Sequence, residues 1–577
     1  MSVDRARAVA LTVDGRRLTD ADVGPSGPAS GVADHGLTVR VVVEPGDGVE
    51  RKWVEVSGRG RLTRVELDRW AGTGFTGFET TGEPVPYNVG AVGLGQPVFG
   101  PGFFAGIEHP LAENLVGPGG TGATLALPVA VDLRPDEPWV SPAAVVGAGG
   151  LEEFWDYLDT LRPVPPRLVA LSNNWYHLGA TGLMDESTVR AEVAGFDAVA
   201  ARHGLALDFV VLDDGWERAL EADWEESTGL WGAMAPSRFP SGAESLGAAT
   251  PRRGPQLGLW LSPFGGYGDR HQARVDWARA HGFEVDPTRN LLCAAGTRYR
   301  AHLAEVLTRW TEAGVGYWKL DGVSFDCAQA DHGHPVGPGA RTAQADAFRG
   351  LVDGIRAVRH DAVVIFTIGS HPSPWWLSTV DFVWRGGLDD TAADQPGSRL
   401  DRFDTYIDTC LQAYRPAALP VSAVVSFSIV ETSVAGYRGD DSGPEGWARH
   451  CWLAAGRGTL HHDLYVAPDS LSDGEWAVLA EALTWARTQE AVLARSHMVL
   501  GDPGAGEVYG FAARKGSAAT ACLRNPSPEI RVLRVDWPTL LGFPAGTALS
   551  VTPRYGALDA LEPFGVLVVE ATTTSGS

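Results

Sequence analysis

The feature that most constrains the fold is an alternation of strand-like and helix-like segments between residues 167 and 490. Amphipathic runs such as TVRAEVAGFDAVAARHG (188–204) separate short apolar runs that read as buried strands. The strand-like runs cover residues 167–172, 206–212, 256–262, 315–320, 362–368, 381–385, 420–428 and 459–465. Eight successive βα-like units are the signature of an α/β fold, the (β/α)8 TIM barrel, which we predict for residues 165–490.

The segments on either side of the barrel have a different pattern. In residues 1–150, runs such as LTVRVVVEPGDG and RLTRVELDRW alternate apolar and polar residues and are broken by Gly, Pro and Asp. This pattern predicts an N-terminal antiparallel β-sandwich. Short strand-like runs also fill residues 495–570, where we expect a small C-terminal all-β domain.

The overall charge limits the classes of partner. The formal net charge is -24 at pH 7, so nucleic acid and anionic membranes would be repelled, and a neutral substrate is favoured. The N-terminus lacks a signal-peptide core, and no stretch approaches the roughly 20 apolar residues of a spanning helix. We therefore expect a cytoplasmic protein that does not bind membranes. A homo-oligomer stays open, because the sequence does not fix the oligomeric state.

Cysteine and histidine spacing gives no indication of a metal. The five cysteines are widely spread and show neither CxxC nor Cys/His metal spacing, which suits reduced thiols. His371, His461 and His462 lie near expected strand ends, but HxH and HExxH spacings are absent. The sequence therefore predicts no structural zinc, no catalytic metal and no cofactor.

The stretch YWKLDGVSFD, residues 317–326, is an aromatic-rich strand that ends in an acid and a glycine. Lys319 and Asp321 are two positions apart and should point to the same side. A lysine inside a strand costs free energy unless its ammonium meets carboxylates or sugar hydroxyls. This predicts a polar pocket with Asp321 as candidate nucleophile. The alternative is an Asp that caps a helix beside a Lys that reaches solvent.

Two other strand ends carry paired acids. Asp213 and Asp214 follow the second strand, and Asp389 and Asp390 end the WRGGLDD stretch after the sixth. A retaining glycosidase needs two carboxyl groups about 5–5.5 Å apart, one as nucleophile and one as acid and then base. We predict that Asp321 attacks the anomeric carbon while Asp389 protonates the leaving oxygen and later deprotonates water.

Cations and aromatic residues at the same rim complete the predicted site. Lys319 and Arg385 would keep Asp321 ionised while they hydrogen-bond ring hydroxyls. The aromatic candidates are Trp175, Trp216, Trp260 and Trp384. Taken singly, the acids could be helix N-caps, the tryptophans packing residues and the arginine a salt-bridge partner. Their joint placement at the ends of strands 1, 2, 3, 4 and 6 favours a site.

The motifs VVLDDGW, GLWLSPFGG, YWKLDG and VWRGGLDD, in this order, resemble the α-galactosidase clan, the melibiases of glycoside hydrolase families 27 and 36. The resemblance covers residues 165–490 and, more loosely, the β-domains that flank the barrel in family 36. It implies a retaining exo-α-glycosidase without metal or cofactor, in the first place an α-galactosidase. The expected substrate is a small neutral saccharide or glycoconjugate.

The resemblance also implies roles for individual residues. Asp321 in KLDG matches the nucleophile, and Asp389, five residues after Trp384, matches the acid/base. Asp213 and Asp214 match the pair that holds the galactose 4- and 6-hydroxyls. The other matches are Lys319 near O3 and O4, Arg385 near O2, Trp260 as an aromatic wall, and Trp175 as the tryptophan after strand 1.

Two departures from the family patterns leave alternatives open. Many family 36 enzymes have a WxSD pattern after strand 6, whereas two glycines follow Arg385 here, so Asp390 is an alternative to Asp389 as acid. Gly369 and Ser370 stand where family 27 galactosidases have a glutamate, which leaves room for an N-acetyl group. An α-N-acetylgalactosaminidase and an α-galactosyl transglycosylase are therefore alternatives. A non-catalytic sugar-binding barrel is a remote one.

Overall fold

The fold is described here from a computed structural model. It describes residues 4–6, 9–19, 31–32, 36–77, 94–217, 230–242, 246, 254–322, 324–367, 372–384, 396–412, 414–415, 417–431 and 443–574. Within these residues, none of the helices combines the length and hydrophobicity needed to cross a membrane.

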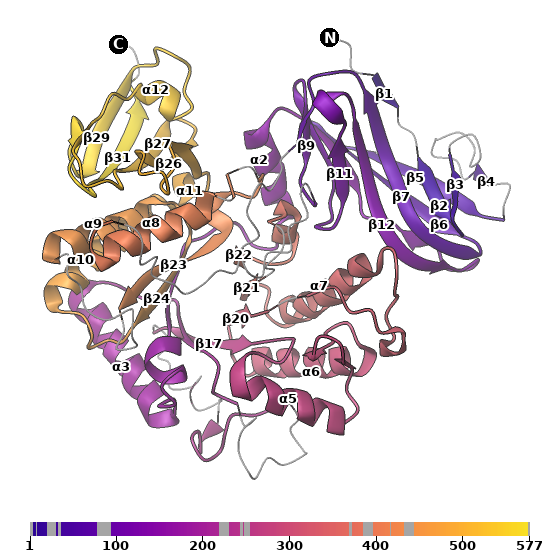
Figure 1. The fold of residues 1–577 in the computed structure, drawn as a ribbon, viewed down its shortest axis with the longest axis horizontal. Coiled ribbons are helices and arrows are strands. Elements are labelled where there is room, and N and C mark those ends of the chain that lie inside the picture. Colours follow the sequence, from indigo (N-terminus) through magenta and orange to yellow (C-terminus); the bar gives the residue numbers. More distant parts are fainter. Residues whose placement is uncertain are drawn as a thin grey trace.

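Eight parallel strands close into a barrel at the centre of the molecule (Figure 1), which confirms the predicted fold class. Every strand begins and ends within four residues of its predicted bounds. In order around the barrel the strands are β15 (Val169–Asn173), β16 (Phe209–Leu212), β17 (Gln256–Leu261), β20 (Tyr317–Leu320), β21 (Val363–Thr367), β22 (Phe382–Trp384), β23 (Val424–Glu431) and β24 (His461–Val466).

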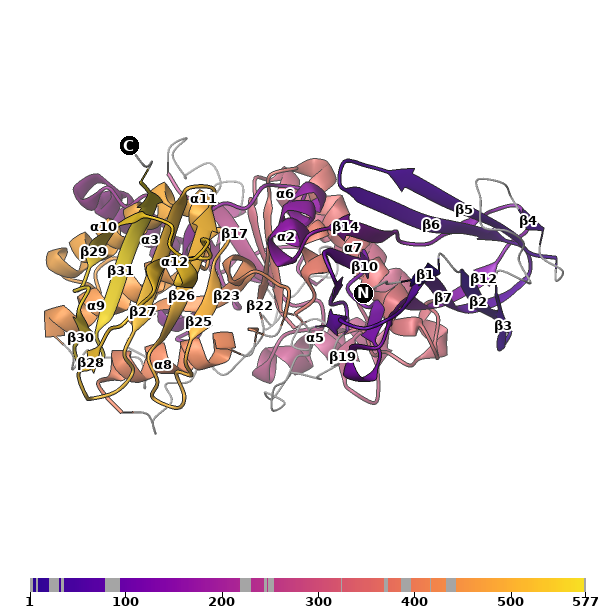
Figure 2. The same ribbon diagram turned by 90° about the horizontal axis from the view of Figure 1, so that it is seen from above.

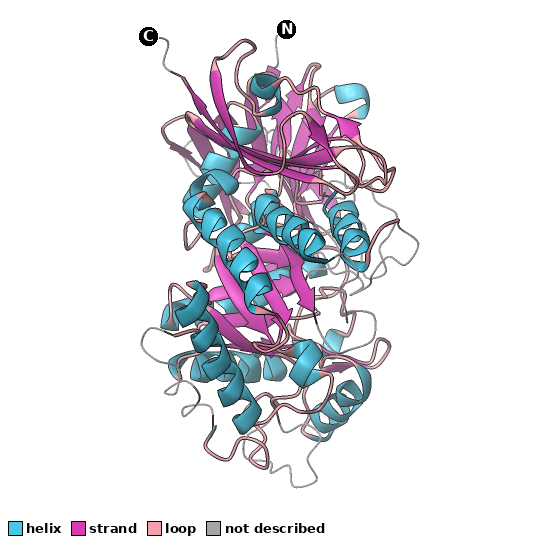
Figure 3. Cartoon of the chain, turned by 90° about the vertical axis from the view of Figure 1, so that its left-hand side faces the viewer, coloured by secondary structure: helices cyan, strands magenta, loops and turns pink. Residues whose placement is uncertain are grey.

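Helices surround these strands, as Figure 3 shows in cyan around magenta. The barrel helices are α3 (Glu186–His203), α5 (Gly268–Ala280), α6 (Thr297–Glu312), α7 (Ala340–Val358), α8 (Arg399–Gln412), α9 (Gly443–Gly456) and α10 (Asp473–Thr488). A short hairpin of β18 (Val285–Asp286) and β19 (Leu291–Leu292) stands between α5 and α6. The described chain between β16 and β17 contains no comparable helix.

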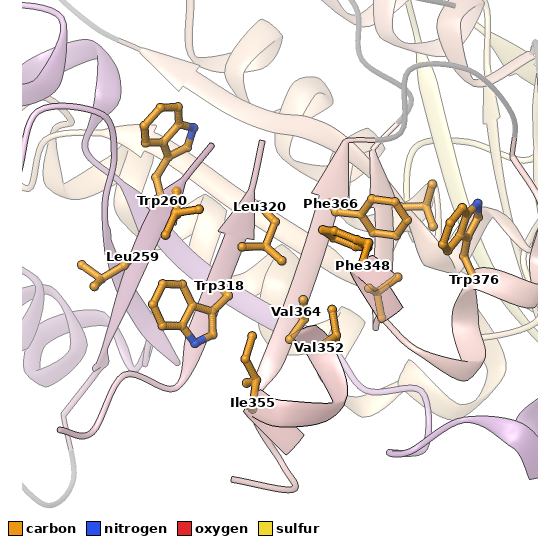
Figure 4. Packing of buried hydrophobic residues seen from close by; sticks show 14 of the residues in the cluster. Leu259, Trp260, Trp318, Leu320, Phe348, Val352, Ile355, Val364, Phe366 and Trp376 are labelled. Carbon is orange, nitrogen blue, oxygen red and sulfur yellow. The ribbon is translucent and has the colours of Figure 1, made fainter. Parts of the chain in front are cut away.

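Alternate residues of β20 face opposite sides of the barrel wall. Trp318 and Leu320 point outward, and Figure 4 shows them with Val364 of β21 beside Val352 and Ile355 of α7. Burial of each aliphatic side chain in this layer stabilises the fold by about 1.5–3 kcal/mol. The same two-residue period turns Tyr317 and Lys319 toward the barrel interior, where both line a small cavity.

Two antiparallel sheets form the N-terminal part and enclose their own apolar core. The first consists of β11 (Glu113–Val116), β12 (Ala123–Leu133), β7 (Gly60–Ala71), β2 (Ala10–Val13) and β3 (Arg16–Leu18), with β1 (Asp4–Ala6) on β7. The second consists of β4 (Gly31–Val32), β5 (Thr38–Pro45), β6 (Val49–Ser57), β14 (Ala144–Ala148), β10 (Phe103–Ile107), β9 (Val98–Gly100) and β8 (Thr76–Gly77), with β13 (Trp139–Val140) on β6. Helix α2 (Leu151–Leu161) then leads to the barrel.

The C-terminal part is a five-stranded antiparallel sheet at the other end of the long axis (Figure 2). Its strands are β25 (His497–Leu500), β26 (Tyr509–Lys515), β27 (Ala518–Arg524), β31 (Val566–Thr573) and β29 (Leu549–Tyr555). The smaller elements here are β28 (Arg531–Val532) paired with β30 (Ala560–Leu561), α11 (Glu490–Leu493) and α12 (Trp537–Leu540).

A buried ionic network joins this sheet to the barrel helices. Arg457, directly after α9, donates to Asp408 of α8 at 2.6 Å and to Asp404 at 2.7 Å. Tyr509 of β26 donates to Asp408 and accepts from Arg524 of β27 at 2.9 Å. Burial alone would raise the pKa of Asp404, but the neighbouring cations outweigh it and hold that pKa below its usual value.

This network predicts a large effect of one substitution. Arg457→Met leaves two buried carboxylates without their main cation, which should cost about 3–5 kcal/mol of stability. Arg134→Met removes an arginine whose ion pair with Glu137 is exposed on both sides, so a change within about 0.5 kcal/mol is expected. Urea unfolding of both variants checks this, and equal shifts in the two midpoints would contradict the assigned role of Arg457.

Candidate active site

Among the predicted site residues, those that the structure describes lie in or after the C-terminal ends of the barrel strands. The structure describes Asp213, Asp214, Asp321, Lys319, Trp175, Trp216, Trp260 and Trp384. The remaining candidates, Arg385, Asp389, Asp390, Gly369, Ser370 and His371, lie outside the described residues.

Asp321 follows β20 directly, and its two carboxylate oxygens are engaged from different elements. Oδ2 accepts a hydrogen bond from Trp260 Nε1 of β17 at 3.0 Å, and Oδ1 accepts one from the Tyr267 hydroxyl at 3.1 Å. Its backbone N–H donates to Leu261 O at 2.9 Å. Two donors on separate oxygens fix the plane of the carboxylate.

Lys319 is a buried cation inside the barrel, and Asp213 neutralises it. The ammonium donates to Asp213 Oδ2 at 2.9 Å, and Asn173 Nδ2 donates to the same oxygen at 2.9 Å. The ammonium also lies 5.5 Å from the ring centroid of Trp384 and 5.9 Å from that of Tyr465, within the range of cation–π attraction. This ion pair joins β16 to β20 across the barrel interior.

Asp214 is paired with a different cation. Arg274 of α5 donates to Asp214 Oδ1 at 2.6 Å, to Gly265 O at 3.0 Å and to Glu217. Burial raises the pKa of Glu217, and the Arg274 guanidinium opposes this rise by stabilising the carboxylate. The adjacent acids Asp213 and Asp214 therefore avoid mutual repulsion because each has its own cation.

The tryptophans at the strand ends fall into two groups. Trp216 is fully buried, donates from Nε1 to Trp260 O at 2.8 Å and packs edge-on against Trp310. Its burial on all sides argues for support of Trp260 rather than contact with a sugar. Trp175, after β15, and Trp384, at the end of β22, are partly exposed.

A small cavity opens beside Lys319 inside the barrel. Its lining residues are Asn173, Tyr317, Lys319, Ile365, Trp384, Val425, Asp463 and Tyr465. Asp463, on β24, is buried and accepts a hydrogen bond from Ser428 N at 3.1 Å. Burial raises the pKa of Asp463 to about 7, although Ser428 N–H and Lys319 act to lower it.

The neighbouring histidines, His461 and His462, are buried. Burial lowers the pKa of His461 and of His462 to about 3, so both rings are neutral near pH 7. His461 Nε2 lies 2.8 Å from the hydroxyl of Tyr317.

Sequence reasoning missed several residues that shape this site. Tyr267 and Arg274 contact the predicted acids, and Glu217 contacts Arg274. None of the three carries a recognisable motif, because each comes from a loop or helix after a strand. Asp463 was also missed, although it lies inside the expected eighth strand, where a carboxylate in an apolar run is itself a signal. The structure also groups Cys293, Cys327, His332 and His334, which the Cys/His spacing did not indicate.

This chain resembles known proteins in its fold but not in its sequence. No protein-family model and no curated protein matches the sequence. The structure is similar to AgaA, a family 36 α-galactosidase from Geobacillus stearothermophilus in complex with raffinose, with a TM-score of 0.60 and 13% identity over 99% of this chain and 87% of that chain.

Two further solved structures show the same likeness. The family 36 α-galactosidase AgaB from Geobacillus stearothermophilus has a TM-score of 0.59 and 14% identity over 98% of this chain and 88% of that chain. The galactosidase domain of the α-galactosidase-sucrose kinase AgaSK has a TM-score of 0.57 and 12% identity over 99% of this chain and 86% of that chain. The chain therefore shares the fold of family 36 α-galactosidases, flanking β-sheets included.

The protonation of Asp463 predicts a pH-dependent stability. The unfolded chain loses this proton near pH 3.9, whereas the folded chain keeps it until about pH 7. Between these values the folded state binds more protons, so stability falls as pH rises, by on the order of 4 kcal/mol in total. Asparagine does not ionise, so Asp463→Asn should not lose this stability. The stability of the variant relative to the unsubstituted chain should therefore increase with pH.

Urea unfolding at about pH 4.5 and about pH 7.5 measures this difference. Asp469→Asn is the matched control, because Asp469 is exposed beyond the end of β24. A stability difference between Asp463→Asn and the unsubstituted chain that is the same at both pH values would contradict the assignment.

Proposed function

We propose that this protein is a retaining exo-α-glycosidase that releases terminal α-galactose through a covalent glycosyl-enzyme on Asp321. The observation that carries the proposal is the Asp321 carboxylate, held by Trp260 and Tyr267 at the C-terminal end of a barrel strand. Chemistry in (β/α)8 barrels belongs to this rim. The shared fold with family 36 α-galactosidases supports the reaction class.

The proposed reaction uses two carboxyl groups in turn. Asp321 attacks the anomeric carbon while Asp389 protonates the departing glycosidic oxygen, so that a glycosyl ester forms and an alcohol leaves. Asp389 then takes a proton from water, which hydrolyses the ester and regenerates Asp321 with net retention at the anomeric carbon. Asp390 is the alternative acid, because both aspartates follow the same strand.

The surrounding polar groups suit recognition of a hexose. We assign Asp213, Asp214 and Lys319 to its hydroxyls, because charged groups form the stronger hydrogen bonds. Arg385 is proposed for the 2-hydroxyl, with Gly369 and Ser370 beside it. Trp175 and Trp384 would bound the apolar faces of the ring, whereas Trp260, expected as an aromatic wall, is buried and holds Asp321 instead.

The proposed substrate is a short neutral α-galactoside. AgaA has been solved in complex with raffinose, and the net charge of -24 disfavours anionic substrates. The alternative with a specific sequence feature is an α-N-acetylgalactosaminidase, because Gly369 and Ser370 would leave space at the 2-position. Assaying an aryl α-galactoside and an aryl N-acetyl-α-galactosaminide in parallel distinguishes the two.

Loss of the Asp321 carboxylate gives the first prediction for function. Asp321→Asn should lower kcat on an aryl α-galactoside by on the order of 10⁴-fold, since the covalent nucleophile is removed. Asp326→Asn is the matched control, because Asp326 lies on the same loop and pairs with Arg341 at an exposed position. Full activity of Asp321→Asn, with circular dichroism confirming its fold, would refute the proposal.

The hydroxyl of Tyr267 gives the second prediction. Tyr267→Phe removes a hydrogen bond to the charged nucleophile, worth about 1.5–3 kcal/mol. Part of this free energy should be lost from the transition state, because the Asp321 carboxylate is then oriented less well. We therefore expect kcat to fall about tenfold, with KM little changed. Steady-state kinetics check this against Tyr555→Phe, which alters a ring stacked on Trp452 near the C-terminal sheet. Equal kinetics for both variants would exclude a role for Tyr267.

A further inference from the structure

Four side chains with metal-binding donor atoms converge beside the candidate active site. Cys293, Cys327, His332 and His334 each offer one ligand atom, and these atoms all lie within 4.8 Å of one another. Cys293, His332 and His334 are buried, and Cys327 is half-buried. We name these four residues the Cys2His2 cluster.

The cluster is built from two separate loops. Cys293 directly follows β19, and its loop leads into α6. The other three residues belong to the loop between β20 and α7, which begins at Asp321. Because one ligand is far from the other three in sequence, the usual Cys/His spacing rules do not detect this set.

The histidines are oriented as metal ligands require. His334 Nδ1 lies 2.9 Å from Pro335 O, so it carries the proton and donates to this carbonyl. His334 Nε2 is buried and has no hydrogen-bond partner among the described residues. In a histidine that binds a metal, one ring nitrogen usually donates to a carbonyl or another acceptor while the other nitrogen coordinates the ion. His332 Nδ1 lies 3.3 Å from Cys327 Sγ.

The backbone around the cysteines is also held in place. The backbone of Cys293 donates from its N–H to Glu284 O at 2.9 Å and accepts at its carbonyl from Gly296 N at 2.8 Å. The buried side chain of Gln344 clamps the backbone of Cys327, accepting from its N–H at 3.1 Å and donating to its carbonyl at 2.8 Å.

Gly333 permits the tight turn between the two histidines. Its φ is +79°, and a Cβ at this position would lie 2.0 Å from Thr297 Oγ1 at the start of α6. Only glycine meets both requirements without a rearrangement. The turn brings the rings of His332 and His334 to a centroid separation of 6.0 Å, nearly perpendicular to each other.

We propose that the Cys2His2 cluster binds one zinc ion. Two thiolates and two imidazoles are a ligand set that Zn²⁺ takes in tetrahedral structural sites. Four protein ligands leave no open position, so the ion has a structural role. Both cysteines bind as thiolates, and each thiol that is protonated beforehand releases its proton to solvent on binding.

The ion would tie the loop that follows β19 to the loop that begins at Asp321. Leu292 N donates to Phe264 O at 3.2 Å, which ties the Cys293 loop to the loop that carries Tyr267. Arg289 donates to Ser324 Oγ at 2.7 Å and links the same hairpin to the loop after Asp321. The proposal concerns metal binding alone and does not depend on the glycosidase activity proposed above.

Metal analysis of the full chain, expressed without a histidine tag and purified without chelator, tests the proposal. Elemental mass spectrometry should find about one zinc per chain. Cysteine alkylation should modify Cys293 and Cys327 only after the zinc is removed. Cobalt substitution should give the intense visible bands of tetrahedral Co²⁺ and a thiolate charge-transfer band. These measurements need no variant and are independent of enzymatic activity.

Single substitutions then locate the site. Cys293→Ser and His334→Gln should each lower the bound zinc at least tenfold after dialysis. Cys410→Ser and His360→Gln, which change a cysteine and a histidine away from the cluster, should retain it. Zinc that persists in both cluster variants, an absent tetrahedral cobalt spectrum, or an intact mass lower by two hydrogens from a Cys293–Cys327 disulfide would each overturn the proposal.

Discussion

The buried ammonium of Lys319 is the constraint on which the barrel interior depends. A charged amine inside a strand is tolerated only with an anionic partner, and here Asp213 provides it at 2.9 Å. Asn173 supports the same carboxylate oxygen, so the ends of β15, β16 and β20 are fixed relative to one another. The position of Lys319 thereby also sets the direction of Asp321, two residues further along the chain.

A second layer of groups holds the acids from outside the barrel. Arg274 pairs with Asp214 and Glu217 and also lies 4.4 Å from the ring centroid of Trp231 and 5.5 Å from that of Trp260. Trp260 in turn donates to Asp321. The candidate nucleophile is therefore oriented by side chains that are themselves neutralised and packed, which is the preorganisation that an electrostatically assisted reaction needs.

The loop that begins at Asp321 is held at several points along its length. Its first residue is held by Trp260 and Tyr267, and its middle by the contacts of Gln344 with Cys327. Its later part carries His332 and His334, which the proposed zinc ion would hold. The C-terminal sheet is joined to the barrel in a different way, through the ionic network around Arg457. Buried polar contacts thus position both the loop and the sheet.

The sequence by itself determined the barrel and the acids that end β16 and β20, because strand period and strand-end residues are local properties of the chain. It also placed Lys319 and Asp321 on one side, since the two-residue period fixes direction. Only the tertiary structure decided which cation meets which acid and that Trp216 is buried. The same holds for Cys293, which joins residues of another loop. These contacts depend on the packing of distant helices and loops, which no local pattern encodes.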